Sequence, residues 1–246
     1  MGKPAVRSRK QTGTVWERTP APPRPVPVPL CRDAIVSAAI ALADTDGLAA
    51  VSLRKVATAL DAGPMRLYGF MSAKDELLDL MADAVYADMD AIDPTSHGWR
   101  DVMRSFFRAM RQAVKAHPWF VELLGGRPHQ GPNALAHLEH LLAALHAEAG
   151  FEDINAVMQA AKTMNAYVIG AIRSEANEVL AERESGMDEA AWQSASWSYM
   201  QRVIATGTFP TLESVVRDAT HPPADFVFNE GLECMLDGIA ARYQAR

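Results

Sequence analysis

The chain has 246 residues, 49% of them hydrophobic, and carries a formal net charge of −6 at pH 7. This length can hold a small domain and a larger one, and the hydrophobic content is ample for buried cores. No apolar run is long enough to cross a bilayer and no apolar signal core lies near the N-terminus, so we expect a cytoplasmic protein without a membrane partner. We expect Cys31 and Cys234 to be free thiols, with Cys234 buried.

The charge is unevenly distributed along the chain. Residues 1–29 carry a net charge of +5, residues 30–80 carry −2 and residues 81–246 carry −9. A negative net charge alone argues mildly against a nucleic-acid-binding protein, but the acidic excess lies mainly in the C-terminal two-thirds. The basic segment 1–29 is rich in proline and is expected to be a disordered arm. The alternative is an arm that contacts DNA phosphates or enters a minor groove.

The next segment has the pattern of short helices separated by tight turns. A first helix is expected at Leu30–Thr45, ended by Gly47. Ser52 is a good N-cap for a second helix, whose apolar residues fall at helical spacing while two basic residues lie on its other face. The apolar residues are Leu53, Val56, Ala57 and Leu60, and the basic ones are Arg54 and Lys55. Asp61 and the following residues form the turn, because Asp and Gly tolerate a positive φ.

Two more helices follow this turn. Pro64 can open a short helix over Pro64–Phe70 at the first helical position, where its missing N–H is not needed. Ser72 is expected to cap a connecting helix over Ser72–Ala91, whose first turn holds acidic residues that the helix dipole favours. Two short helices, a turn of about three residues and a second helix with basic and aromatic side chains indicate a helix-turn-helix.

This run resembles the DNA-binding domain of TetR-type repressors. The matching features are Gly47-Leu48, Ser52-Leu53-Arg54-Lys55-Val56-Ala57, Leu67-Tyr68, Lys74 and Leu77-Leu78. The chain departs from the family pattern at Asp61, where the family usually has glycine in the turn. Because Asp can adopt the left-handed conformation, we expect the turn to be kept.

From Trp99 onward the pattern is helical throughout. The expected helices are Trp99–His117, Pro118–Leu124, Asn133–Ala149, Asp153–Ala181, Asp188–Ala205 and Ala224–Tyr243, with a loop at 182–188 and irregular chain at Gly207–Pro223. Several motifs resemble the C-terminal domain of the tetracycline-repressor branch of the family. They are Trp99, Ala116-His117-Pro118-Trp119, Gly126-Arg127-Pro128, Gly131-Pro132-Asn133 and Tyr167-Val168-Ile169-Gly170. The resemblance implies a homodimer formed through residues 153–181 and 224–243.

The resemblance also implies which residues contact operator DNA. Tyr68 and Lys74 match positions that hold the DNA backbone, and Arg54 matches a position that reaches a base edge, where arginine can read guanine. Met65 and Arg66 lie at the start of the recognition helix. The full set of DNA-binding candidates is Ser52, Arg54, Lys55, Met65, Arg66, Tyr68 and Lys74.

A ligand pocket is expected inside the C-terminal bundle, where helices face one another. Its candidate residues are Met103, Phe106, Phe107, Met110, His117, Met164 and Tyr167. For each Met or Phe taken singly, core packing is the favoured interpretation. The family's tetracycline-binding members anchor the drug with an Asn, a Phe and a Glu, and these positions here read Phe106, Met110 and Ser174. An apolar or aromatic effector, with no cofactor and no metal, is therefore expected.

The sequence thus predicts an all-α protein with three parts: an arm at 1–29, a three-helix helix-turn-helix head at 30–75, and a larger helical bundle at 76–246 for ligand binding and dimerisation. The resemblance implies a ligand-responsive transcriptional regulator, in most members a repressor of a palindromic operator. The alternative is an all-α metal-binding enzyme, because His137 and His140, with Glu139 between them, have a spacing that can share a metal.

Overall fold

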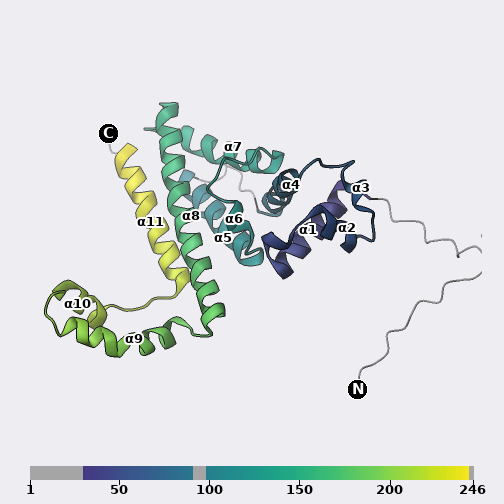
Figure 1. Cartoon of the computed structure of the whole chain (residues 1–246). Coiled ribbons are helices and arrows are strands. Elements are labelled where there is room, and N and C mark those ends of the chain that lie inside the picture. Colours follow the sequence, from purple (N-terminus) through teal and green to yellow (C-terminus); the bar gives the residue numbers. More distant parts are fainter. Residues whose placement is uncertain (1–29, 91–97, 244–246) are drawn as a thin grey trace, which may run out of the picture.

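The computed structural model describes residues 30–90 and 98–243, and every regular element in these ranges is a helix (Figure 1). The elements are α1 (Arg32–Asp46), η2 (Leu48–Ala50), α2 (Leu53–Ala59), α3 (Pro64–Leu67), α4 (Lys74–Ala87), α5 (Trp99–Ala116), α6 (Phe120–Leu123), α7 (Pro132–His146), α8 (Ile154–Ser185), α9 (Glu189–Ile204), α10 (Pro210–Asp218) and α11 (Ala224–Tyr243). The all-α expectation is confirmed, whereas the arm at 1–29 lies outside the described residues. None of the described helices is both long and apolar enough to span a membrane.

The head is built by α1, α2 and α3 around a small apolar core. Ile35 and Ala39 of α1 pack with Val56 of α2 and Leu67 of α3, and all four side chains are fully buried. Ser52 caps α2 as expected, because its Oγ accepts a hydrogen bond from the Lys55 N–H at 3.2 Å. The core fixes α2 and α3 against α1, so their outer faces are held at a defined angle.

The turn between α2 and α3 contains the left-handed residue that the sequence suggested. Asp61 has a φ of 48°, whereas Gly63 has a φ of −69° and needs no special freedom. Asp tolerates this conformation better than most residues with a side chain. The chain therefore keeps the turn of a helix-turn-helix with Asp61 in place of the family's usual glycine.

The connecting helix α4 is shorter than expected, because it begins at Lys74 and ends at Ala87. Ser72 is not its N-cap; the N-cap position is Ala73. The Ser72 N–H instead donates to Glu76 Oε2 at 2.7 Å, so Glu76 reaches back from the first turn. Figure 1 shows α4 lying between the head and the larger bundle.

The bundle, which we call the body, consists of α5 to α8 and α11. Helix α8 runs the length of the body and α11 lies along it (Figure 1). Phe228, Leu232, Leu236 and Ile239 of α11 are buried, and Leu232 and Leu236 are fully so. These residues are therefore occupied inside the protomer. Cys234, on another face of α11, is exposed rather than buried as expected.

Helices α9 and α10 extend from the end of α8 (Figure 1). From here on, 'the arm' means α9 and α10 and not residues 1–29. Two expectations were wrong in this region. Helix α8 continues through most of the expected loop at 182–188 and ends at Gly186, which has a φ of 68°. The stretch expected to be irregular at Gly207–Pro223 contains α10, because Pro210 occupies the first turn, where it favours a helix, and Val215 and the neighbouring residues continue it.

Candidate functional site

The outer face of α2 and α3 carries most of the predicted DNA-binding residues. Arg54, Lys55 and Arg66 are exposed. Met65 is 80% exposed and Tyr68 is 53% exposed, although both are large side chains with apolar surface. The fold thus exposes basic side chains on α2 and basic, apolar and aromatic side chains on α3. This combination is suited to phosphates, base edges and thymine methyl groups.

Lys74 is held differently from the other basic residues. It is half-buried at the start of α4, and its Nζ donates to the carbonyl oxygen of Leu48 at 3.4 Å. This contact anchors the lysine against η2, beside the helix-turn-helix. Ser52 lies at the N-terminus of α2, where its Oγ is already used as a cap.

The predicted ligand residues are mostly packed in the interior of the body. Met103, Phe106, Phe107, Met110 and Met164 are buried members of one apolar core. The rings of Phe106 and Phe107 meet edge to face, with centroids 5.4 Å apart. Tyr167 is half-buried on α8, and its hydroxyl approaches Gly231 of α11 so closely that a Cβ on Gly231 would lie 1.9 Å from it.

His117 lies away from this interior, at the junction of head and body. Its Nδ1 is 2.7 Å from Asp44 Oδ1, at the end of α1. Trp119 Nε1 donates to the same oxygen at 2.7 Å. The sequence analysis gave His117 as a candidate ligand residue. In this structure it contacts Asp44 across the junction of head and body.

Two cavities adjoin these elements. One, of about 510 Å³, lies at the junction of α1, the α5–α6 segment and α8, with Asp44, Trp119 and Leu180 in its wall. The other, of about 820 Å³, lies between α8, the start of the arm and the start of α11, with Trp192 in its wall. Both volumes are in the range of small-molecule sites. Of the predicted ligand residues, Tyr167 lies in the wall of the second cavity. The other wall residues were not anticipated, because they come from helices that are far apart in the chain.

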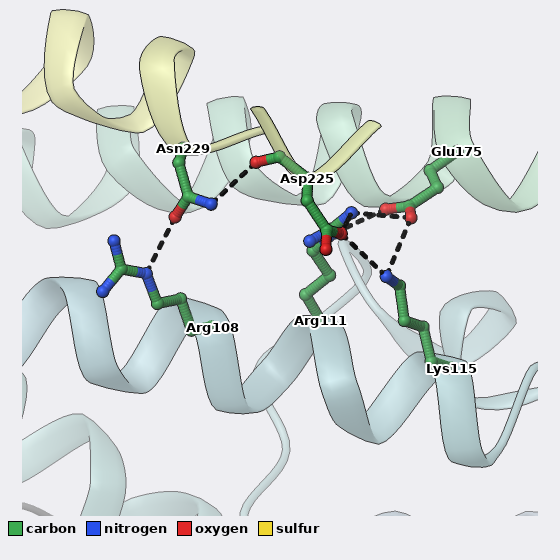
Figure 2. Close-up of polar contacts among 6 residues, drawn as sticks. All are labelled: Arg108, Arg111, Lys115, Glu175, Asp225 and Asn229. Atoms are coloured by element: carbon green, nitrogen blue, oxygen red, sulfur yellow. Dashed lines mark hydrogen bonds and ion pairs between the residues drawn. The ribbon is translucent and has the colours of Figure 1, made fainter. Parts of the chain in front are cut away.

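A polar network that the sequence did not indicate joins α5, α8 and the start of α11 (Figure 2). Arg111 is only 4% exposed. Its Nε and Nη2 donate to the two carboxylate oxygens of Glu175 at 2.6 and 2.8 Å, and Nη2 also pairs with Asp225 Oδ1 at 2.7 Å. Lys115 Nζ lies 3.3 Å from Glu175 Oε1 and 3.2 Å from Asp225 Oδ1. The guanidinium also covers the Phe228 ring, 4.7 Å from its centroid.

This network sets the ionisation of its carboxylates. Burial alone would raise the pKa of Glu175, but hydrogen bonds and charge from Arg111 and Lys115 outweigh burial and hold that pKa below its usual 4.5. Hydrogen bonds from Arg111 and Lys115 likewise lower the pKa of Asp225. Both carboxylates are therefore charged at neutral pH, so the buried arginine is fully paired.

The histidines of α7 do not lie together as metal ligands. His137 is buried, and its Nε2 is 2.9 Å from the carbonyl oxygen of Tyr86. Because a carbonyl can only accept, this nitrogen carries the proton. His140 Nδ1 is buried without a hydrogen-bond partner among the described residues, beside a space of about 10 Å³. In the described parts of the chain, His, Cys, Asp and Glu form no group of three or more with metal-binding geometry.

A helix-turn-helix head with exposed basic and apolar side chains, connected through α4 to an all-α body, is the architecture of a transcriptional regulator. The model of the tetracyclin repressor-like C-terminal domain matches residues 93–243. The chain belongs to the TetR family of transcriptional regulators.

Three relatives show how far the similarity extends. An HTH-type transcriptional regulator of Saccharopolyspora erythraea is 40% identical over 234 residues, covering 93% of this chain and 92% of that protein. The HTH-type transcriptional repressor DrrR1 of Streptomyces coeruleorubidus is 33% identical over 226 residues, covering 92% of this chain and 83% of the relative. The structure of the Streptomyces coelicolor TetR family protein ActR in complex with actinorhodin has a TM-score of 0.73 at 25% identity. The match covers 88% of this chain and 99% of the ActR chain.

These similarities decide between the two classes of function that the sequence left open. The relatives are regulators over almost the whole length of the chain. The chain is therefore a regulator rather than an enzyme, and the alternative built on His137 and His140 is rejected.

Proposed function

We propose that the protein is a repressor that binds a palindromic operator as a homodimer and is released by an apolar or aromatic small molecule. The observation that carries this proposal is the exposed face of α2 and α3. Met65, Tyr68 and Phe70 are 80%, 53% and 37% exposed, and such a group of large apolar side chains on one short segment marks an interaction site. The basic residues around it make DNA the fitting partner. DrrR1, a relative over most of the chain, is named a repressor.

Within this proposal the predicted residues have distinct roles. Arg54 reads a base edge from α2, and Met65 with Arg66 contacts bases from the start of α3. Lys55, Tyr68 and Lys74 contact the phosphate backbone, and Ser52 sits at the N-terminus of α2, which favours phosphate.

The homodimer is supported by apolar surface that one protomer leaves uncovered. On α8, Ile154 and Met158 are exposed, and on α11, Val227 is exposed. The arm adds more, because all described residues of α9 and α10 are exposed or half-buried, including Trp192 and Trp197. We therefore place the second copy on residues 153–181 and 224–243, with the arm as an additional contact.

The effector is placed in the interior of the body, among Met103, Phe106, Met110 and their neighbours. Methionine side chains are flexible and can make room for a ligand. ActR, which has the same fold, was solved in complex with actinorhodin. A ligand there would enter a largely apolar setting, which favours an apolar or aromatic compound.

Selection of DNA fragments from a random pool by the full-length protein tests the DNA part of the proposal. The enriched sequences should form an inverted repeat, with half-site centres about 10 base pairs apart or a multiple of that spacing. Arg66→Ala should reduce binding to the enriched DNA. Enrichment of no sequence, or of a single half-site bound by one protomer, would contradict the proposal.

A screen of planar aromatic compounds for release of the enriched DNA tests the effector part. Ala113 is half-buried against the core on α5, so Ala113→Phe adds a ring to the interior. We expect this variant to bind DNA but lose its response to compounds that release the wild type. Gln112→Phe, on the exposed side of the same helix, is the matched control. An unchanged response in Ala113→Phe would place the effector elsewhere.

A further inference from the structure

Helix α4 is one of two places at which the head meets the body, the other being Asp44 of α1 with His117 and Trp119. It packs against α1 of the head on one side and against α7 of the body on the other. Helix α7 in turn packs against α5 and α8, which carry the interior residues described above. Whatever fixes α4 on α7 therefore fixes the head relative to the body.

Asp83 of α4 makes this attachment. The residue is 8% exposed, and its Oδ1 accepts hydrogen bonds from the backbone N–H groups of Asn133 and Ala134, each at 3.0 Å. Its Oδ2 accepts from Asn133 Nδ2 at 2.9 Å. Asn133 and Ala134 are the second and third residues of α7, whose N–H groups have no partner within their own helix.

Asp83 thus acts as an N-cap that is supplied by another helix. The residue at the N-cap position of α7 is Gly131, which has no side chain to cap it. The glycine also leaves room, because a Cβ on Gly131 would lie 2.2 Å from Asp83 Oδ1. A carboxylate at a helix N-terminus is favoured by the dipole and makes strong, charge-assisted hydrogen bonds.

A second bond lies one turn further along both helices. The carbonyl oxygen of Tyr86, three residues after Asp83, accepts from His137 Nε2 at 2.9 Å, and both residues are buried. The two attachments together fix the register of α4 on α7. A slide of either helix would leave the buried Asp83 carboxylate and the buried His137 Nε2–H without partners, which is costly.

We infer that Asp83 is a positioning residue for operator binding, which makes α4 and α7 move as one unit so that the body sets the position of the head. The inference rests on the proposed function and deepens it. A ligand that displaces α7 from inside the body moves α4 with it, because the carboxylate holds the two helices together. Without the carboxylate, the head is no longer held at the spacing that the operator requires.

The test compares Asp83→Asn with Asp79→Asn in the full chain. The Asn side chain has the same shape, and its Oδ1 can still accept from the Asn133 and Ala134 N–H groups, but it has no charge and presents an NH₂ group to Asn133 Nδ2, so the attachment is weakened. Asp79 lies one turn earlier on α4, its side chain is 77% exposed and its Oδ1 lies 3.8 Å from His129 Nδ1, a long and exposed pair, so Asp79→Asn controls for the loss of one surface charge. Gly131→Ala is a second variant, because it displaces the carboxylate without changing any charge.

Three measurements are made on each variant below its melting temperature. The first is affinity for DNA enriched by the wild type. The second is amide exchange at Asn133 and Ala134. The third is the distance distribution between spin labels on Cys31, which is exposed at the start of α1, and on Glu139→Cys, exposed on α7. The labelled protein carries Cys234→Ala and is diluted with unlabelled protein, so that only distances within one chain are measured.

We expect Asp83→Asn and Gly131→Ala to weaken operator binding by about tenfold or more, to speed exchange of both amides and to broaden the distance distribution. Asp79→Asn should match the wild type. A purely stabilising role would lower the melting temperature while leaving the distance distribution and operator affinity unchanged, and this result would overturn the inference. Failure of the wild type to enrich any DNA would instead reject the proposed function, and the exchange and distance measurements would still decide whether Asp83 joins α4 to α7.

Discussion

For single residues, the proposed DNA-binding face depends on which side chains the head leaves outside its core. Leu67 is fully buried, whereas the next residue, Tyr68, is half-exposed. The same short helix therefore has one anchoring side chain and several side chains available to a partner. Arg54 lies on the exposed side of α2, opposite the buried Val56 and Ala57. The roles of these exposed residues follow from their chemistry and can be separated by substitution.

Arg54→Ala should relax sequence preference by about 1–3 kcal/mol, because a bidentate contact to a base edge distinguishes one base pair from another. Lys74→Ala should weaken binding to all sequences similarly and reduce the salt dependence, since a phosphate contact carries no sequence information. Affinities for enriched and random DNA, measured at several salt concentrations, separate the two effects. Unchanged discrimination in Arg54→Ala would show that Arg54 is not a base reader.

Glu175 gives a pH-dependent prediction. Its pKa is lowered in the folded protein, so its contribution to stability is fully present above pH 4.5 and is lost as the pH falls through the folded-state pKa. Glu175→Gln should therefore melt below the wild type at neutral pH, and the difference should narrow below about pH 4.5. Thermal melting between pH 7 and pH 3 measures this. Glu178→Gln, exposed one turn along the same helix, serves as the control, and a pH-independent difference for Glu175→Gln would contradict the assignment.

Among the helices, α11 has three faces that differ in what covers them. One face carries Leu232 and Leu236, which are buried against the protomer's own core. A second carries Glu233, which accepts from Arg104 Nε on α5 at 2.6 Å. The face left exposed contains Val227, Cys234 and Gly238. Leu232 and Leu236 are thus covered by the same chain, so within 224–243 we place the proposed interface on this exposed face.

Gly238→Gln tests that interface without harming the protomer. A Cβ at Gly238 meets no atom within 4 Å, and replacing glycine within a helix stabilises it by about 0.5–1 kcal/mol. The longer side chain would keep two copies of α11 apart. We expect sedimentation to show weaker dimerisation with an intact fold, together with weaker operator binding. Gly238→Ala is the graded control and should remain largely dimeric; equal dimerisation of all three proteins would remove α11 from the interface.

At the scale of the whole molecule, head and body are joined at two places that lie far apart in the sequence. One is the attachment of α4 to α7 through Asp83. The other is Asp44 at the end of α1, which accepts hydrogen bonds from Trp119 and His117 after α5. The cavity of about 510 Å³ adjoins the second junction. Movement of the head therefore requires that polar contacts at both places be kept or exchanged.

Asp44→Ala should lower the free energy of unfolding by about 1–3 kcal/mol, because it leaves the buried Trp119 N–H without its acceptor. It should also loosen the head from the body. Urea unfolding followed by tryptophan fluorescence and circular dichroism gives both the stability and the coincidence of the transitions. Asp46→Ala, exposed two residues further along, is the control. A loss no greater than that in Asp46→Ala would show that this junction contributes little.

Much of the local structure of the head follows from signals that lie close together in the sequence. Apolar residues at helical spacing, Ser52 as a cap, Gly47 as a stop and Pro64 as a helix start act over a few residues, so the helices of the head could be read directly. The exposed residues of α2 and α3 were identified for the same reason. The family motifs around Trp99 and Tyr167 likewise placed the body within the tetracyclin repressor-like domain.

Side-chain contacts between helices that are far apart in the sequence could be found only in the tertiary structure. His117 pairs with Asp44 and Arg111 pairs with Glu175 across separations of 73 and 64 residues, and no local pattern marks such partners. The same holds for Asp83. It can cap α7 only because the N-cap residue of α7, Gly131, has no side chain and lies beside Asp83. Helical spacing shows which face of a helix is apolar, but only packing decides whether that face is covered by the same chain, as on α11, or left exposed, as on α9 and α10.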